Sequence, residues 1–506
     1  MKQGLKTYLD TVKNEYTIEQ VAYYANLDLV SKVFPEIAAN VVKELENQRT
    51  HLKLIASENY STLSVQVAMG NLLTDKYAEG SPEHRYYGGC EQVDAVEMAA
   101  DTLACEVFGA EHAYVQPHSG ADANLVAYWA ILNKRIEEQY LKQFETTVNG
   151  KLQTKKLEDL SETEWQELRQ LLGNQKLMGL DYYSGGHLTH GYVQNVSSKM
   201  FVCTPYSVDK NTGMLDYDAI EAQALKEKPL ILLAGYSAYP RKINFKRFSE
   251  IAKKCGATFM VDMAHFAGLV AGKVFEGEYN PVLWADVVTS TTHKTLRGPR
   301  GALVLCKNEY ADAVDKGCPL VIGGPLPHVM AAKAVALKEA SSSDFQKYAH
   351  AVQANCAVLA DECLKLGMKL QTNGTDNHLL LIDVTGYGLN GRQAETALSE
   401  CGVTSNRNSL PFDVNGPWWT SGLRIGTPAI TTLGMGEKEM RQIAHIIHKV
   451  LSASKPGLTP SGKPSKANVI IEESVKAEVI TEVKALLERF VLYPELDLEM
   501  MKKIYC

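Results

Sequence analysis

The stretch ATFMVDMAH, residues 257–265, decides the fold class of this chain. It begins with a short, mostly apolar run and turns polar at Asp262 and His265. Such a run is typical of a strand that is buried on both faces of a parallel sheet. In open α/β sheets, ligands bind at the carboxyl ends of the strands. The stretch therefore predicts a buried strand that delivers two polar side chains to a binding site.

Further strands and helices are expected on both sides of this stretch. Residues 91–107 repeat apolar side chains at helical spacing, which predicts a helix. Short apolar runs of strand length occur at 113–115, 230–234, 286–290 and 302–306. The alternation predicts an α/β core. With 506 residues, 45% of them hydrophobic and 22% charged, the chain is long enough for two or three globular domains.

Two segments interrupt the alternation. Residues 133–176 are charged and contain two amphipathic stretches, the second of which opens with Ser161 and Glu164 at capping-box spacing. We expect an inserted helical hairpin there. Residues 454–468 are rich in proline, glycine, serine and lysine, which predicts a flexible linker. The apolar side chains from Val475 to Phe490 then form one face of a terminal helix.

Charge and cysteine content narrow the class of protein. The 52 basic and 59 acidic residues give a formal net charge of -7, which predicts no nucleic-acid partner and no anionic membrane partner. The 10 cysteines are scattered without metal-ligand spacing, so we expect free thiols and no metal site. No signal-peptide core and no apolar run of membrane-spanning length is found, so a soluble cytoplasmic protein is expected.

The strongest chemical signal is TSTTHKTLRGPRG, residues 289–301, which places Lys294 among hydroxyl side chains and beside His293. A deprotonated lysine amine attacks carbonyls and forms a Schiff base. Taken alone, a lysine is more often an exposed partner of an acidic residue. Asp262 strengthens the chemical interpretation, because pyridoxal-phosphate enzymes use an aspartate to keep the pyridine nitrogen protonated. Its alternative role is to cap the following turn.

Three further motifs fit the same chemistry. In QPHSGADAN, Ser119 and Gly120 precede a helix and form a candidate phosphate cup, although an ordinary turn has the same pattern. In SGGHLTHG, His187 follows two glycines that would let its ring lie flat against a planar ligand, although a plain loop histidine is the alternative. In TSGLRIGTPA, Arg424 suits bidentate binding of an amino-acid carboxylate.

Long motifs containing these residues follow one another along the chain. They are LIASENY (54–60), KYAEGSPEHRYYGG (76–89), QPHSG (116–120), GGHLTHG (185–191), VDMAHFAGL (261–269), TTHKTLRGPRG (291–301), GGPLPH (323–328), GTDNHL (374–379) and TSGLRIGTPA (420–429). In this order they resemble the serine hydroxymethyltransferase family, from about residue 35 to about residue 450. The resemblance implies a fold-type-I, pyridoxal phosphate (PLP)-dependent transferase with a mainly parallel seven-stranded sheet.

The resemblance also implies a domain division and a shared site. We expect an N-terminal arm (1–75), a large PLP-binding domain (76–340) and a smaller C-terminal α/β domain (341–506). The active site would lie between the subunits of a homodimer. Its substrates would be serine, glycine and tetrahydrofolate, between which a one-carbon hydroxymethyl group is transferred reversibly.

By the resemblance, Lys294 carries the Schiff base, Asp262 pairs with the pyridine nitrogen, and Glu79 is the acid-base residue. The implied catalytic residues are Lys294, Glu79, His187, Asp262 and Tyr87. The implied cofactor-binding residues are Ser119, Gly120, His187, Ser237, Asp262, His265, His293, Lys294 and Gly324 of the partner subunit. The implied substrate-binding residues are Ser57, Tyr77, Glu79, Tyr87 and Arg424. The implied folate-binding residues are Glu79, Tyr86, Leu188 and Asn408.

Other functions remain open from the sequence. A folate-independent PLP aldolase or alanine racemase would need the same Lys294, Asp262 and Arg424. A non-catalytic homologue could keep the fold and use the 133–176 insertion for docking. One departure from the family pattern concerns the cofactor directly: Asp122 adds an acidic group near the expected phosphate, which is electrostatically unfavourable unless its side chain points away.

Overall fold

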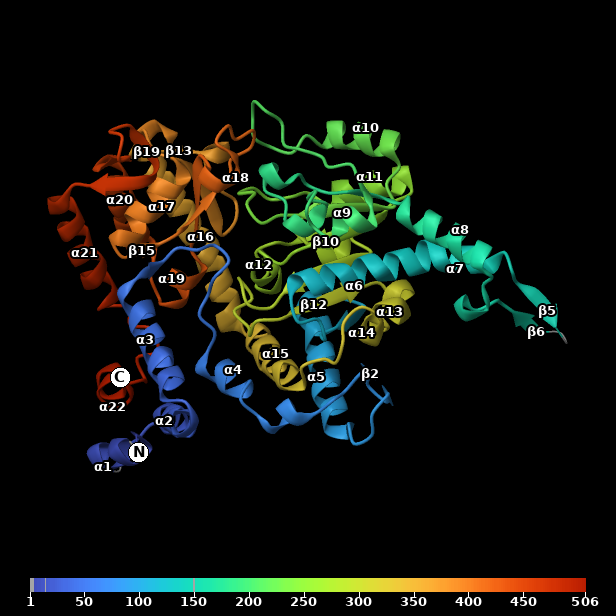
Figure 1. The fold of residues 1–506 in the computed structure, drawn as a ribbon, viewed down its shortest axis with the longest axis horizontal. Helices are drawn as coiled ribbons and strands as arrows, with labels where there is room; N and C mark the ends of the chain where they lie inside the picture. The colour runs from blue at the N-terminus through green and yellow to red at the C-terminus, as the bar shows by residue number, and fades with distance from the viewer. Residues whose placement is uncertain (1–3, 14, 149–150) are drawn as a thin grey trace.

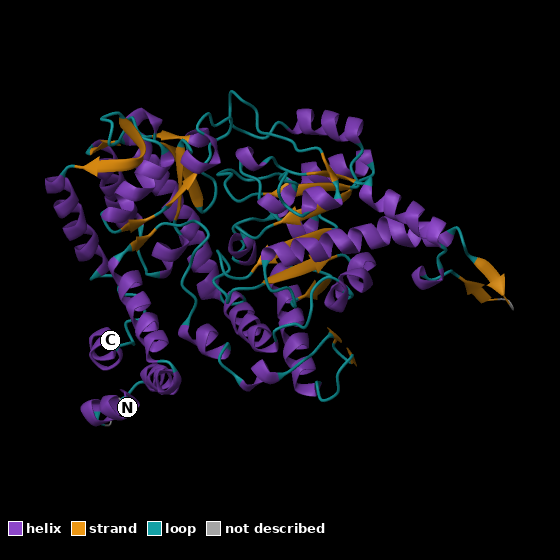
Figure 2. Ribbon diagram, viewed as in Figure 1, coloured by secondary structure: helices purple, strands orange, loops and turns teal. Residues whose placement is uncertain are grey.

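The computed structural model describes residues 4–13, 15–148 and 151–506. At its centre is a seven-stranded sheet (Figures 1 and 2). Across the sheet the strands are β4 (His112–Tyr114), β12 (Ala302–Cys306), β11 (Val287–Thr291), β10 (Thr258–Asp262), β9 (Ile231–Gly235), β7 (Lys176–Met178) and β8 (Val202–Cys203). Only β12 runs antiparallel to its neighbours β11 and β4. The predicted mainly parallel seven-stranded sheet is confirmed.

Buried side chains alternate between the two faces of this sheet. In β10, Phe259 and Val261 belong to the core on one face, whereas Met260 belongs to the core on the other. Helices α5 (Glu91–Phe108) and α11 (Phe245–Cys255) cover the first face, and α6 (Gly120–Leu132) and α13 (Asn308–Asp315) cover the second. Burial on both faces explains why the central strands are mostly apolar.

A smaller α/β unit follows in the chain. Its antiparallel sheet has the order β13 (Lys369–Leu370), β14 (Leu379–Asp383), β17 (Gly422–Gly426) and β16 (Asn406–Asn408). It packs with α16 (Ser343–Lys365), α17 (Gly391–Glu400), α20 (Glu437–Ser452) and α21 (Glu473–Leu487). Leu52 and Leu54 also enter this core, and β1 (Leu52–Lys53) pairs with β15 (Val403–Thr404). The predicted domain boundaries stay predictions.

The two ends of the chain pack together (Figure 1). Helices α1 (Gly4–Val12), α2 (Ile18–Val33) and α3 (Pro35–Thr50) share a small core with α22 (Leu498–Tyr505), which was not predicted. Other helices and strands are α4 (Leu63–Ala68), β2 (Gly80–Ser81), β3 (His84–Arg85), α9 (Ser197–Met200), α10 (Tyr217–Glu227), α12 (Ala267–Ala271), α14 (Gly317–Leu320), α15 (Pro327–Ala340), α18 (Gly416–Trp419) and α19 (Pro428–Thr432). None of the helices in the described residues is long and apolar enough to cross a membrane.

The insertion at 133–176 is more than a helical hairpin. Helix α6 continues through a π-helical turn (Asn133–Glu137) into α7 (Glu138–Lys142), and α8 (Glu162–Gly173) returns beside it, capped by Ser161 and Glu164 as predicted. Between the helices, β5 (Thr146–Val148) and β6 (Lys151–Gln153) form a β-hairpin that projects from the body of the molecule (Figure 1). The prediction missed this hairpin because its strands are short and mostly polar.

The prediction of a flexible linker at 454–468 is wrong. The segment forms an antiparallel hairpin of β18 (Ser454–Leu458) and β19 (Pro464–Ile471). The side chain of Gln393 donates hydrogen bonds to the carbonyls of Ser465 and Asn468, and Asn390 donates to the carbonyl of Lys466. These contacts come from α17 and its cap, so the local composition of the segment does not reveal them.

Candidate active site

Lys294 lies in the loop that follows β11. Its Nζ donates a hydrogen bond to Thr291 Oγ1 at 3.0 Å, and that hydroxyl donates to the carbonyl of Ala264. Burial lowers the pKa of Lys294 to about 8, against the opposing effect of the Asp262 charge. Because only the neutral amine attacks a carbonyl, this environment favours a reactive lysine over an exposed one that pairs with an acid.

Asp262 is the last residue of β10 and is buried. Its Oδ2 accepts hydrogen bonds from Asn124 Nδ2 at 2.9 Å and from His190 Nε2 at 3.2 Å, and its Oδ1 accepts one from the backbone N–H of Ala264. Burial alone would raise the pKa of Asp262, but these side chains and the nearby His187 hold it below its usual range. The carboxylate therefore stays ionised and can accept a hydrogen bond from a cationic ring.

The His187 loop is tied to the same aspartate. His187 Nδ1 lies 2.7 Å from Thr189 Oγ1, which also accepts a hydrogen bond from Asn124 Nδ2 at 2.8 Å. Asn124 Oδ1 in turn accepts from Thr289 Oγ1 of β11. Burial lowers the pKa of His187 to about 4, so its imidazole is neutral at ordinary pH. One hydrogen-bonded network thus fixes His187 and Asp262 relative to each other.

The glycines before His187 have a packing role that was not predicted. Gly185 has a φ of +103°, and a Cβ there would lie 2.7 Å from the carbonyl group of Ala238. The carbonyl of Gly185 accepts a hydrogen bond from the backbone N–H of Ser237 at 2.8 Å. Glycine therefore lets the His187 loop approach the Ser237 loop closely, and both loops carry predicted site residues.

His265 is buried beside a second histidine. Its Nδ1 lies 3.3 Å from His378 Nε2, and the two rings are stacked with centroids 5.5 Å apart. Burial lowers the pKa of both rings, that of His378 to about 3, and the charges of Lys294 and Arg424 lower both further. The pair therefore stays neutral at the boundary between the large sheet and β14.

Arg424 lies on β17 and reaches out of the smaller unit toward the Ser237 loop. Its Nη1 donates to the carbonyl of Ser237 at 2.7 Å, its Nη2 to Ser57 Oγ at 3.4 Å and its Nε to Asn406 Oδ1 at 3.2 Å. Burial lowers its pKa to about 10. Within the described residues no carboxylate pairs with it, which is costly for a buried charge unless an anionic ligand binds.

Ser119 and Gly120 begin helix α6. Ser119 caps the helix by accepting a hydrogen bond from the backbone N–H of Asp122, and a Cβ at Gly120 would lie 2.8 Å from Thr291 of the Lys294 loop. The Asp122 carboxylate lies 3.9 Å from the Nδ1 of His118. The cup and the Lys294 loop are therefore in direct contact, and the helix N-terminus offers backbone N–H groups to an anion.

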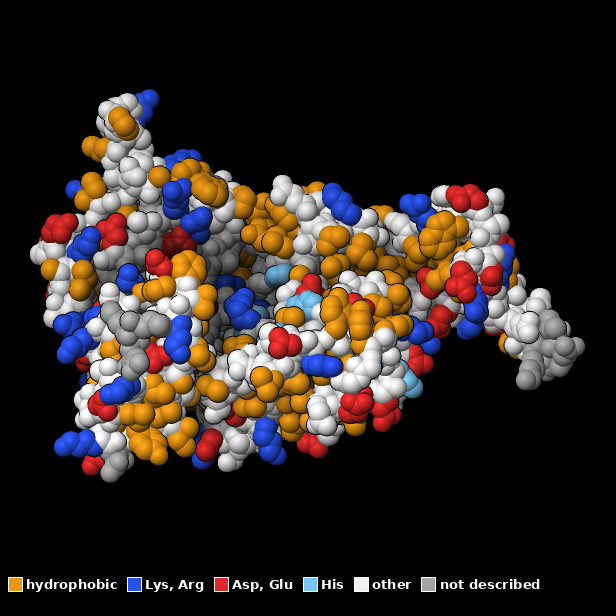
Figure 3. Space-filling model, turned by 60° about the horizontal axis from the view of Figure 1, so that its bottom comes forward, with side chains coloured by type: hydrophobic (Ala, Val, Ile, Leu, Met, Phe, Trp, Pro, Cys, Tyr) orange, Lys and Arg blue, Asp and Glu red, His pale blue; other side chains and the backbone are white. Residues whose placement is uncertain are grey.

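His293 contributes an unsatisfied polar atom to this region. In the described part of the chain its buried Nδ1 has no hydrogen-bond partner. Burial lowers the pKa of His293 to about 3, so the ring is neutral. This buried nitrogen next to Lys294 is therefore free to bind a polar ligand atom. Figure 3 shows a hollow on one face of the molecule in which histidine and basic side chains are visible.

Five predicted residues form a separate cluster, which we call the hairpin group: Tyr77, Glu79, Tyr86, Tyr87 and Gly324. They surround the β2–β3 turn, where the rings of Tyr77 and Tyr87 lie 4.7 Å apart. A Cβ at Gly324 would lie 2.9 Å from the Tyr77 ring, and the Glu79 charge raises the pKa of Tyr77. No hydrogen bond or ion pair between described residues joins this group to Lys294 or Arg424.

The two remaining folate candidates lie apart from the hairpin group as well. Leu188 directly follows His187 and is 41% exposed. Asn408 lies on β16, pairs in register with Gly422 and donates a hydrogen bond to the carbonyl of Ser409. Both residues therefore belong to the loops and strands around His187 and Arg424.

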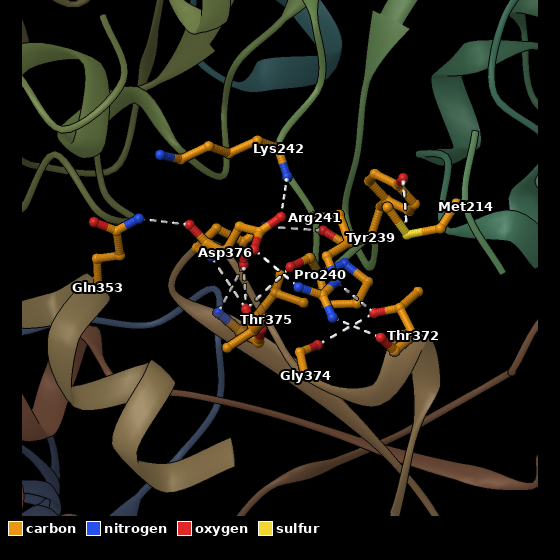
Figure 4. Close-up of polar contacts among 12 residues, drawn as sticks. Met214, Tyr239, Pro240, Arg241, Lys242, Gln353, Thr372, Gly374, Thr375 and Asp376 are labelled. Carbon is orange, nitrogen blue, oxygen red and sulfur yellow. Dashed lines mark hydrogen bonds and ion pairs between the residues drawn. The ribbon is translucent and has the colours of Figure 1, made fainter. Parts of the chain in front are cut away.

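Arg241 and Thr375 form a set of hydrogen bonds between the two α/β units, which we call the clamp (Figure 4). Arg241 donates hydrogen bonds to Thr372 Oγ1, to the carbonyl of Thr372 and to Asp376 Oδ1, at 3.0, 2.6 and 2.8 Å. Thr375 donates to the carbonyl of Pro240 at 3.0 Å. The clamp joins the segment after Ser237 to the segment before His378, so it fixes the position of the large sheet relative to β14 and β17.

Four residues of this network were not singled out from the sequence: Asn124, Thr189, His190 and His378. They lie within or just beyond quoted motifs, but each acts through Asp262, His187 or His265, so only their spatial position reveals their role. The donor atoms of His187, His190 and Asp262 lie within 4.8 Å of one another and could hold a metal ion. Hydrogen bonds to Asn124 and His190 already occupy Asp262 Oδ2.

Comparison with known proteins places this geometry in a family. The profile of serine hydroxymethyltransferase matches residues 30–152 and 162–447. A serine hydroxymethyltransferase of Treponema pallidum is 64% identical over 495 residues, covering 98% of this chain and 85% of that protein. Those of Salinispora tropica and Chlamydia muridarum are 54% and 51% identical, covering 95% and 99% of this chain and 99% and 100% of those proteins. The chain therefore belongs to the serine hydroxymethyltransferase family, whose members have the fold-type-I architecture.

Proposed function

We propose that this chain transfers a hydroxymethyl group reversibly between serine and tetrahydrofolate, with glycine as the other product and PLP as cofactor. Family membership over nearly the whole chain supports the reaction class, and the family generally uses PLP with tetrahydrofolate. The observation that carries the proposal for this chain is the convergence of a part-buried lysine of lowered pKa, an ionised buried aspartate and a part-buried arginine that pairs with no carboxylate of the described residues.

The residues present fit PLP. Lys294 offers an amine, Asp262 offers an ionised acceptor, and the Ser119–Gly120 helix start offers N–H groups to a phosphate. The orphaned Nδ1 of His293 is available to a polar ligand atom. Bound there, PLP supplies an aldehyde for imine formation and a protonated ring that accepts the electron pair of a breaking bond at the amino-acid α-carbon.

The protein's own part in the reaction follows from its side chains. Lys294 would hold PLP through its side-chain amine and, as a neutral amine, would accept and return the proton at the amino-acid α-carbon. Arg424 binds the substrate carboxylate with two donors, supported by Ser57. His187 covers one side of the site from a loop that Asn124 and Thr189 fix. Ser237 and His265 border the site next to Arg424 and His378.

The hairpin group completes the site of a second copy in this proposal. Tyr77, Tyr86 and Tyr87 are 55%, 73% and 44% exposed in one chain, which is unusual for neighbouring aromatic side chains. In a homodimer, Glu79 of one chain would hold or deliver a proton at the transferred carbon of the other chain's substrate. Tyr86 would meet the pterin together with Leu188 and Asn408 of the other chain, and Gly324 would meet the phosphate.

The test is the visible absorbance of the purified protein with PLP, then with glycine, then with glycine and tetrahydrofolate. A band of lysine-bound cofactor that is replaced by a strong longer-wavelength band only when folate is added supports the proposal. A cofactor band without any folate response would favour the folate-independent aldolase or racemase. The absence of any cofactor band would favour a non-catalytic homologue.

A further inference from the structure

Lys333, in the middle of α15, is a buried lysine that is only 2% exposed. Its Nζ donates hydrogen bonds to three backbone carbonyls: those of Val115, Pro117 and Ala302, at 2.5, 2.9 and 2.9 Å. An ammonium has three donors, so the three carbonyls use all of them. Buried lysines are rare without such partners. The position therefore serves a defined purpose in the fold.

The positions of the three carbonyls in the fold indicate what Lys333 does. Val115 and Pro117 lie between the end of β4 and the Ser119–Gly120 phosphate cup, and Ala302 is the first residue of β12. The carbonyl of Pro117 also accepts a hydrogen bond from the backbone N–H of Ala302 at 3.1 Å. Lys333 thus ties the segment that leads into the cup to the neighbouring strand.

The residues around Lys333 leave space for its aliphatic chain and influence its protonation. A Cβ at Gly301 would lie 2.5 Å from Lys333 Cε, so only glycine leaves room for the stem there. Burial lowers the pKa of Lys333 to about 7, while the charges of Glu97, Asp101 and Asp122 oppose that shift. Asp122 is the acidic residue whose place beside the cup was unfavourable from the sequence. The charge of Asp122 thus helps to keep Lys333 protonated.

We propose that Lys333 is a positioning residue for the cofactor phosphate: it fixes the carbonyls of Val115 and Pro117, and with them the Ser119–Gly120 cup. The inference rests on the proposed PLP function. It goes beyond that function because Lys333 does not touch the cofactor and acts only through the backbone of the cup.

The test compares PLP with pyridoxal, which lacks the phosphate, in the full-length protein. Affinity for each is measured by absorbance titration after the cofactor has been removed. In Lys333→Met, we expect affinity for PLP to fall by at least tenfold, while affinity for pyridoxal changes by less than twofold. The matched control is Lys307→Met, which removes another lysine from the end of β12, paired with Asp286 at 2.6 Å; its ratio of the two affinities should stay that of the parent.

A second variant covers the case in which Lys333→Met does not fold. Gly301→Ala keeps the lysine but pushes its stem aside, and it should lower the ratio of PLP to pyridoxal affinity in the same direction. Equal loss of both affinities in either variant, or an unchanged ratio in both, would overturn the proposal and leave Lys333 a purely structural residue. Failure of the parent protein to bind either compound would instead contradict the proposed function.

Discussion

The two groups of predicted site residues differ in how complete they are within one chain. Around Lys294, the side chains are buried or part-buried, hydrogen-bonded to one another and shifted in pKa by burial. Around Glu79, the aromatic side chains are exposed. The backbone on both sides of Glu79 is held by Arg85, which donates hydrogen bonds to the carbonyls of Ala78 and Gly80. The first group is held by contacts within one chain, whereas the second is an exposed surface that, in the proposed homodimer, would meet the other chain.

Replacement of Lys294 should abolish the activity that depends on the first group. In Lys294→Ala, no amine remains to form the imine or to move the proton, so turnover of serine with tetrahydrofolate should fall on the order of 10⁴-fold or more. Activity is measured as glycine formation, and circular dichroism checks the fold. A variant that turned over at the parent rate would remove Lys294 from the mechanism. Lys307→Met, as the control, should retain parent activity.

Glu79→Gln tests whether the second group belongs to the site of another chain. Loss of a proton-transfer residue lowers the rate by about 10²- to 10⁴-fold, without changing PLP affinity. Mixing Glu79→Gln with Lys294→Ala under conditions that exchange subunits should then restore about a quarter of the parent activity, since half the dimers are mixed and each has one intact site. If mixing restores nothing although subunits exchange, both residues act within one chain.

The same contrast explains what the sequence could predict. Strand 257–261 was predicted one residue from the observed Thr258–Asp262, because burial on both faces leaves an apolar run and a polar end. His190 and Asn124 were not predicted because they act through contacts with Asp262 and the His187 loop, which lie far away in the chain or become visible only in the fold. The hairpin at 454–468 was missed because Gln393, far away in the chain, satisfies its carbonyls. Local sequence patterns do not reveal contacts between residues that are far apart in the chain.

The pH dependence of imine formation between Lys294 and PLP is a further test of the buried group around Lys294. Below its pKa of about 8, the neutral fraction of Lys294 rises about tenfold per pH unit, so the rate of imine formation should rise with pH and level off above about 8. A lysine with the ordinary value of 10.5 would keep rising well beyond that point. Stopped-flow absorbance with PLP between about pH 6 and 10 measures this.

Two variants accompany that experiment. Asp262→Asn removes the negative charge that raises the pKa of Lys294, so the midpoint should move to lower pH. Lys307→Met, which removes a lysine paired with Asp286, should leave the midpoint unchanged. A midpoint near 10 in the parent protein would contradict the buried environment of Lys294, and a midpoint that Asp262→Asn does not move would contradict the electrostatic link between the two residues.

The smallest expected effect concerns the clamp that sets the first group's geometry. Arg241→Met removes three hydrogen bonds to Thr372 and Asp376, so the free energy of unfolding should fall by about 1–3 kcal/mol. Because the clamp adjoins Ser237, whose carbonyl holds Arg424, KM for serine should rise more than kcat falls. A double-mutant cycle with Asp376→Asn isolates the ion pair. Equal effects on KM and kcat, or no effect on either, would mean that Arg424 is positioned by β17 alone. The two α/β units could then shift relative to each other without disturbing the residues around Lys294.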